Sequence, residues 1–126
     1  MKDPLVSVLM PAYNCEGYVE NSIKGILAQG YENFEFVIVN DGSTDSTKSK
    51  IRSFSDGRIK YLENATNRGL VATLNLGLGY CGGKYILRAD ADDYAFPYIM
   101  ENFVRFMEAH PDYVVCGANI RIRYAD

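Results

Sequence analysis

Short strand-like runs alternate with helical patterns along this chain, and this alternation limits the fold more than any other feature. The strand-like runs are residues 5–10, 34–40, 58–63 and 84–89. Most of them are rich in β-branched residues and almost continuously apolar, which is typical of strands buried on both faces of a parallel sheet. We therefore expect an α/β fold, with a mainly parallel, Rossmann-like sheet covered by helices on both faces.

The segments between these strands carry apolar residues three and four positions apart, which is the spacing of one helical face. We expect helices over residues 19–30, 68–79 and 98–110, and Ile51 and Phe54 suggest a short helix within residues 41–54, after the turn and cap residues that open this stretch. Residues 113–124 are expected to form a final strand, broken at Gly117. No linker, repeat or low-complexity segment interrupts the pattern, so residues 1–126 are expected to form a single domain.

Composition excludes several classes of protein. The 126 residues carry 13 basic and 16 acidic side chains, a net charge of −3, which argues against a nucleic-acid or anionic-membrane binder. Three dispersed cysteines without a CxxC pair, and one histidine, make a zinc site improbable. The sequence shows no signal peptide and no membrane-spanning apolar run. We therefore expect a cytoplasmic protein without a membrane span.

Three polar clusters follow predicted strands: Pro11–Asn14, Asn40–Ser43 and Asp90–Asp93. In open α/β sheets, ligands bind at the carboxyl ends of the strands. We expect the three clusters to meet at that edge of the sheet and to form the functional site.

The stretch NDGSTDST, residues 40–47, combines turn residues with one acid that needs a further explanation. Gly42 suits an unusual backbone angle, and Ser43 or Thr44 would cap the next helix. Ordinary turn chemistry does not explain Asp41, whose carboxylate follows a buried strand and requires a donor. The N3–H group of uracil or the N1–H group of guanine would supply a charge-assisted hydrogen bond to it.

The acids Asp90, Asp92 and Asp93 directly follow another buried strand. They could be solvated loop acids, or one of them could cap the next helix, but capping does not use three. Two carboxylates in D-x-D lie on the same side of an extended segment, where they suit Mg²⁺ or Mn²⁺. The acids match a calcium loop and an aspartyl-phosphate phosphatase only partly.

Two other features have simpler interpretations. The stretch GLGYCG, residues 77–82, matches a dinucleotide-binding pattern, but it follows a helix and precedes a strand, the reverse of the required order. Its glycines are expected at a helix end and in a turn. Arg68 is either a solvated loop charge or a side chain that reaches a phosphate.

Five stretches in order, VSVLMPAYN, ILAQGYENFEFVIVNDGSTDST, RIKYLENATNRGL, LNLGL and GKYILRADADDYAFP, cover nearly the whole chain. Together they resemble the family-2 glycosyltransferases of GT-A fold. The resemblance implies a nucleotide-diphospho-sugar donor, a divalent cation, Mn²⁺ or Mg²⁺, and usually inversion at the anomeric carbon.

The resemblance also implies roles for individual residues. Asp41 matches the acid that binds the base, Asp90 and Asp92 match the metal-binding DxD motif, and Asp93 matches a supporting acid. Two positions depart from the family pattern: Asn40 replaces a common acid, and Leu74 replaces a common arginine. The implied nucleotide-binding residues are Pro11, Ala12, Tyr13, Asn14, Asp41, Gly42, Arg68, Asn75, Asp90 and Ala91, and the implied metal ligands are Asp90, Asp92 and Asp93.

Family members usually continue through an acceptor-binding half that carries the catalytic base, and nothing in this chain matches that base. The resemblance thus implies the donor-binding half of a transferase, with the base beyond Asp126 and the acceptor a carbohydrate or a lipid-linked glycan. It implies polysaccharide or cell-surface glycan synthesis, with the full-length protein peripheral at the inner face of the membrane. Apolar surface that the missing half would cover favours a homo-oligomer. A nucleotide-sugar-binding domain without activity and a metal-dependent phosphohydrolase remain alternatives.

Overall fold

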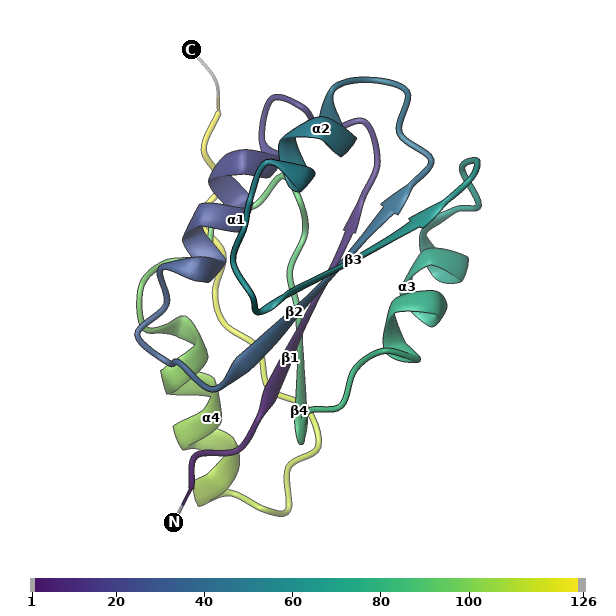
Figure 1. Ribbon diagram of the computed structural model, residues 1–126. Coiled ribbons are helices and arrows are strands. Elements are labelled where there is room, and N and C mark those ends of the chain that lie inside the picture. Colours follow the sequence, from purple (N-terminus) through teal and green to yellow (C-terminus); the bar gives the residue numbers. More distant parts are fainter. Residues whose placement is uncertain (1, 125–126) are drawn as a thin grey trace.

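The computed structural model describes residues 2–124 and contains a parallel four-stranded sheet (Figure 1). The strand order is β3-β2-β1-β4, and all three pairings are parallel. This arrangement confirms the expected sheet. The strands are β1 (Val6–Ala12), β2 (Phe34–Asp41), β3 (Ile59–Asn64) and β4 (Tyr85–Arg88).

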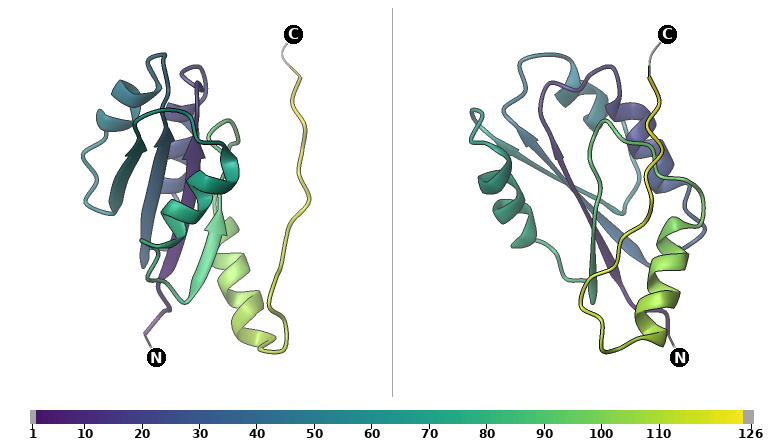
Figure 2. Two further views of the ribbon diagram at one scale, coloured as in Figure 1. Left: turned by 90° about the vertical axis from the view of Figure 1, so that its right-hand side faces the viewer. Right: turned by 180° about the vertical axis from the view of Figure 1, so that it is seen from behind.

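Three helices connect the strands and a fourth follows the last strand, and together they cover both faces of the sheet, as expected (Figures 1 and 2). The helices α1 and α4 lie over one face, α3 lies over the other, and α2 packs against α1. Their bounds are α1 (Val19–Leu27), α2 (Thr47–Arg52), α3 (Leu70–Leu78) and α4 (Ile99–Ala109).

Alternation along β1 divides the core between the two faces. Val8 and Met10 belong to the larger apolar cluster, which also contains the buried side of α1 and residues of α4. Leu9 faces the opposite way and joins Val37 and Val39 beneath α3. Burial on both faces explains why these strands have nearly continuous apolar sequences.

One glycine of GLGYCG has a different place from the one expected. Gly77 lies inside α3 rather than at its end, and a Cβ atom there would lie 2.3 Å from Leu9 Cδ1. The absence of a side chain lets α3 approach the sheet closely. Gly79 is the residue after the helix, and Gly82 and Gly83 belong to the connection to β4.

The expected final strand over residues 113–124 is wrong for this structure. The segment is extended but pairs with no strand among residues 2–124, and Figure 2 shows it standing away from the sheet. Val114 and Ile120 are 89% and 85% exposed. Alternating apolar residues favour a strand only where a neighbour supplies hydrogen bonds and a covered face. No helix among residues 2–124 is long and apolar enough to cross a membrane.

Candidate functional site

The loops that follow the four strands gather at one end of the sheet (Figure 1). Strands β1 and β2 end level because Ala12 pairs with Asn40, and β2 and β3 end level because Asp41 pairs with Asn64. The acid-bearing loop follows β4, whose Arg88 is in register with Leu9 of β1. The fold therefore brings the predicted strand-end clusters to a common edge.

Side-chain to backbone hydrogen bonds join the loop after β1 to the loop after β2. The Asn14 N–H donates to Ser43 Oγ over 3.1 Å, and the Thr44 N–H donates to Asn14 Oδ1 over 2.8 Å. The Cys15 N–H donates to Thr47 Oγ1 over 2.8 Å. Asn14 adopts a φ of 45°, in a region that asparagine tolerates better than most residues.

These bonds correct the expected helix cap. Neither Ser43 nor Thr44 caps α2, which begins at Thr47 after Ser46 without a side-chain capping bond. Their polar groups bind Asn14 instead, 29 and 30 positions away in sequence. Such a distant partner leaves no local pattern in the sequence.

Asp41 lies at the end of β2 and is only 4% exposed. Its Oδ1 accepts from the Asn64 amide and from the Arg68 N–H, both over 2.8 Å, and its Oδ2 accepts from the Gly69 N–H over 3.0 Å. Burial by itself raises the pKa of this carboxyl. Hydrogen bonds from these three residues and Thr73 outweigh burial and lower the pKa below its ordinary value.

The structure thus supplies donors that the sequence did not indicate. Asp41 is an ionised, buried carboxylate held by the last residue of β3 and by the loop that leads to α3. Oδ1 accepts from the Asn64 amide and the Arg68 N–H, whereas Oδ2 accepts from the Gly69 N–H. Protein groups therefore satisfy much of the carboxylate's acceptor capacity of about four hydrogen bonds.

Gly42 continues the contact between the loops after β2 and β3. It has a φ of +67°, and a Cβ atom built there would lie 2.4 Å from the carbonyl carbon of Thr66. Both the left-handed backbone and the close approach require a residue without a side chain. The prediction of an unusual backbone angle at Gly42 is confirmed.

The other predicted nucleotide-binding residues are spread along this edge and beyond it. Ala12 is buried at the end of β1, whereas the next residue, Tyr13, is 48% exposed. Arg68 holds Asp41 through its backbone N–H, and its residue surface is exposed. Asn75 lies exposed midway along α3, and among residues 2–124 no hydrogen bond joins it to the strand-end loops.

The acid cluster after β4 has few partners within the protein. Arg88 Nη2 lies 3.2 Å from Asp90 Oδ1, in a pair whose side chains are 53% and 45% exposed. The Asp93 N–H donates to the Asp90 carbonyl over 3.1 Å, which closes a turn. Burial, followed by the charges of Asp92 and Asp90, raises the pKa of Asp93. The three carboxylates therefore repel one another.

Two residues of α1 and one that follows its end hold the acid-bearing loop, and the sequence interpretation did not single them out. Ser22 and Gln29 bind backbone carbonyls of this loop, and Gly25 packs against Tyr94. The signal in the sequence that could have revealed them is the presence of two polar residues, Ser22 and Gln29, near the apolar positions Ile23 and Ile26 of the predicted helix. Periodicity alone cannot say which segment they bind.

A profile of Glycosyl transferase family 2 matches residues 7–126. The chain belongs to this glycosyltransferase family. One relative, an uncharacterised glycosyltransferase of Haemophilus influenzae, is 45% identical over 121 residues, 94% of this chain and 38% of the relative. The Escherichia coli UDP-Glc:alpha-D-GlcNAc-diphosphoundecaprenol beta-1,3-glucosyltransferase WfgD is 42% identical over 74% of this chain and 37% of its own length. The chain spans less than half the length of these relatives.

Two solved glycosyltransferase structures resemble this family 2 chain. Staphylococcus aureus TarS 1–349 in complex with UDP-GlcNAc has a TM-score of 0.79 and 28% identity, over 84% of this chain and 32% of TarS. The mannosyltransferase PcManGT from Pyrobaculum calidifontis, in complex with GDP-Man and Mn²⁺, has a TM-score of 0.78 and 28% identity, over 85% and 33%. The predicted GT-A fold is confirmed.

The acids of this family 2 chain suit a cation that is shared with a ligand better than a cation that is held by protein side chains alone. Among residues 2–124, no group of three or more His, Cys, Asp or Glu side chains is arranged to hold a metal ion. Mg²⁺ commonly binds through one or two carboxylates together with substrate phosphates, without an all-protein cage. The exposed Asp92 and the weakly paired Asp90 fit this second mode.

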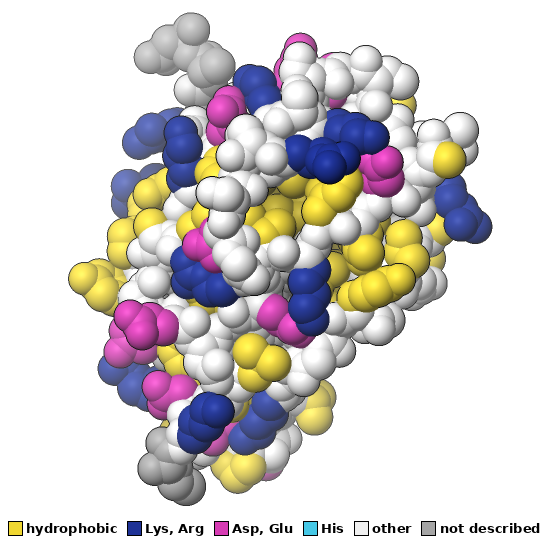
Figure 3. Space-filling view, viewed as in Figure 1, with side chains coloured by type: hydrophobic (Ala, Val, Ile, Leu, Met, Phe, Trp, Pro, Cys, Tyr) yellow, Lys and Arg dark blue, Asp and Glu magenta, His cyan; other side chains and the backbone are white. Residues whose placement is uncertain are grey.

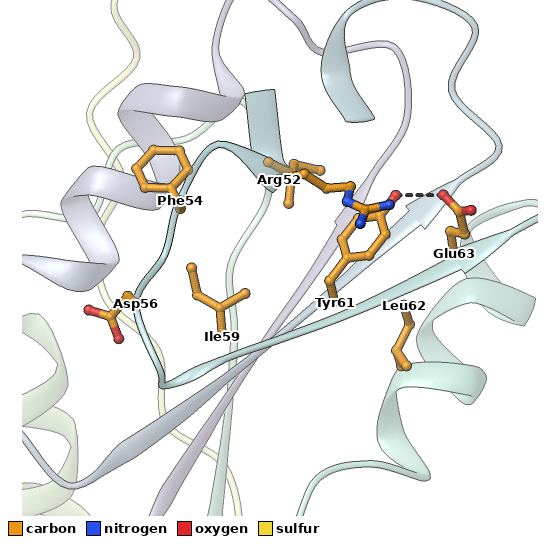
Figure 4. A pocket seen from close by; sticks show the side chains of 8 residues that line it. Arg52, Phe54, Asp56, Ile59, Tyr61, Leu62 and Glu63 are labelled. Atoms are coloured by element: carbon orange, nitrogen blue, oxygen red, sulfur yellow. Dashed lines mark hydrogen bonds between the residues drawn. The ribbon is translucent and has the colours of Figure 1, made fainter. Parts of the chain in front are cut away.

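A hollow in the family 2 chain lies beside β3 and contains none of the predicted site residues (Figure 4). Tyr61 O–H donates to Glu63 there, and burial followed by this bond raises the pKa of Tyr61 to about 12. Apolar and charged side chains intermingle on this face of the molecule (Figure 3). The hollow is lined by Ile51, Arg52, Phe54, Asp56, Ile59, Tyr61, Leu62 and Glu63.

Proposed function

We propose that this chain is the donor-binding part of a family 2 glycosyltransferase. The whole enzyme transfers a sugar from a UDP-sugar to an acceptor hydroxyl with inversion, in polysaccharide or cell-surface glycan synthesis. The E. coli relative carries the name of a UDP-Glc-dependent glucosyltransferase, and the similar TarS structure contains UDP-GlcNAc. These two proteins support the choice of a UDP-sugar.

The proposal rests chiefly on the contrast between two acidic sites at one sheet edge in a family 2 fold. Asp41 is buried and ionised, and it lies at the carboxyl end of β2. A base N–H group, such as uracil N3–H, donates to this carboxylate. The backbone of Pro11, Ala12 and Tyr13 lines the adjoining nucleoside pocket.

The second acidic site holds the diphosphate end of the donor. Asp90 and Asp92 bind Mg²⁺ or Mn²⁺, and Asp93 supports them from the turn that it shares with Asp90. When bound, the cation supplies charge neutralisation for the departing nucleoside diphosphate. The mannosyltransferase that resembles this chain contains Mn²⁺, which supports a cation of this kind.

The residues described here bind the donor and do not deprotonate the acceptor. The matched segments make up only 38% and 37% of these two relatives, which supports a catalytic base beyond Asp126. The E. coli relative has a diphosphoundecaprenol-linked acceptor in its name, which supports a lipid-linked acceptor here as well.

Calorimetric titration of the chain with UDP, with and without Mn²⁺, tests the proposal. We expect binding that strengthens with Mn²⁺ and a loss of that dependence in Asp92→Ala. Asp112→Ala, which removes an exposed acid outside the strand-end loops, is the matched control and should bind as the wild type does. Binding that ignores Mn²⁺, or no binding at all, would contradict the metal–diphosphate role. Release of inorganic phosphate from UDP would favour a phosphohydrolase.

A further inference from the structure

Between residues 90 and 95, the loop that carries the acids has one internal backbone hydrogen bond, from the Asp93 N–H to the Asp90 carbonyl. Its other contacts run to Ser22 and Gly25 of α1 and to Gln29, which follows the end of that helix. Ser22 and Gly25 are three positions apart and so lie on one side of α1, and the Gln29 amide continues from them by donating to the Gly25 carbonyl. We name Ser22, Gly25 and Gln29 together the α1 clamp.

Ser22 lies under the acids themselves. Its Oγ donates to the Ala91 carbonyl over 2.8 Å and also lies within hydrogen-bonding distance of the Asp93 carbonyl. Ser22 is 2% exposed, and the Ala91 side chain is packed in the main core cluster. Ala91 stands between the two proposed cation ligands, so the Ser22 hydroxyl fixes the backbone from which both carboxylates project.

Gly25 and Gln29 hold the rest of the loop. A Cβ atom on Gly25 would lie 3.2 Å from ring carbons of Tyr94 and 3.3 Å from the Ala95 carbonyl. The Gln29 amide donates to the Phe96 carbonyl over 2.9 Å, and its Oε1 accepts from the Met100 N–H over 3.2 Å. The clamp therefore extends from the acids to the first turn of α4.

We propose that the α1 clamp positions Asp90 and Asp92 for the cation and the donor diphosphate, with Ser22 as its main positioning residue. This inference rests on the proposed function. Like charges in one short turn drive the carboxylates apart, so backbone anchors are needed to keep them on a common side. Ser22 acts through the backbone of Ala91 and Asp93 and does not itself touch the donor.

The test compares UDP with Mn²⁺, which needs the acids, and uridine, which needs only the base pocket. In Ser22→Ala we expect affinity for UDP with Mn²⁺ to fall about tenfold and affinity for uridine to stay within about twofold. Ser7→Ala is the matched control, because Ser7 is also fully buried and its hydroxyl binds Glu35 and the Gly83 N–H, far from the acids. It should lower the melting temperature and keep the affinity for UDP with Mn²⁺.

Hydrogen exchange supplies a readout that needs no ligand. In Ser22→Ala, amides of residues 91–98 should exchange at least tenfold faster, whereas those of β1 and β2 keep their wild-type rates. Unchanged exchange in this loop, or equal losses of uridine and UDP–Mn²⁺ affinity, would overturn the clamp. If the loop loosens but the wild type binds no UDP with Mn²⁺, the proposed function fails and the positioning of the loop stands.

Gly25→Ala covers the case in which Ser22→Ala does not fold. Alanine favours a helix over glycine, while its methyl group meets the Tyr94 ring at 3.2 Å. We expect weaker affinity for UDP with Mn²⁺ and no change for uridine. Wild-type affinity for both ligands would contradict the proposal.

Discussion

The acids at the ends of β2 and β4 share an edge of the sheet but differ in how the protein treats their charge. Asp41 is buried and accepts hydrogen bonds from the last residue of β3 and from two backbone N–H groups just before α3. The acids after β4 are partly or fully exposed, and among residues 2–124 their side chains have one weak partner, Arg88. A carboxylate whose charge is already stabilised by protein hydrogen bonds suits a neutral N–H group of a ligand. A cluster of carboxylates whose charge is not compensated suits a cation.

The largest expected difference between the two sites is in stability. Asp41→Ala should lower the free energy of unfolding by about 3 kcal/mol or more, because it leaves the Asn64 amide and two backbone N–H groups without their acceptor. Asp92→Ala should change the free energy of unfolding by less than about 0.5 kcal/mol. Urea unfolding of both variants measures the difference. Equal losses would remove the distinction between the sites.

A smaller effect is expected where the loop after β2 meets the loop after β3. Gly42→Ala combines a left-handed backbone with a Cβ contact of 2.4 Å to Thr66, so it should cost about 2 kcal/mol or more. Gly57→Ala is the matched control, because a Cβ atom there meets nothing within 4 Å. Thermal unfolding compares the two. A harmless Gly42→Ala would mean that the loops are not held together as described.

The smallest expected effect concerns pH. The pKa of Asp41 is lowered in the folded chain, so its ionised form contributes stability above the unfolded value of 3.8. That contribution is lost as the pH falls from 3.8 through the folded pKa. Urea unfolding between pH 6 and pH 3 should therefore show a shallower acid decline in Asp41→Asn than in the wild type. A parallel decline in both proteins would contradict the role of Asp41.

Local sequence patterns predicted the sheet and the positions of the helices well. Each expected strand before residue 90 forms, and the polar clusters after β1, β2 and β4 meet at one edge as the parallel arrangement requires. Apolar periodicity reports burial of individual elements, and the chain order of strands and helices then limits how they pack.

Contacts between distant segments could not be predicted in this way. Ser43 binds Asn14, Asp41 binds the Arg68 backbone, and Ser22 binds Ala91, at sequence separations from 27 to 69 residues. Polar side chains have many possible partners, and the fold chooses among them only after packing is complete. The same reason explains residues 113–124, whose strand-like pattern needs a neighbour that the sequence does not specify.

Two of the groups that donate to Asp41 are backbone N–H groups, of Arg68 and Gly69. Any residue except proline supplies such a donor, so the carboxylate does not depend on which side chain stands at position 68. The arginine side chain at position 68 can therefore be exchanged for another while the Asp41 carboxylate keeps its backbone donor. The side chain at this edge can change independently of the contact that holds the carboxylate.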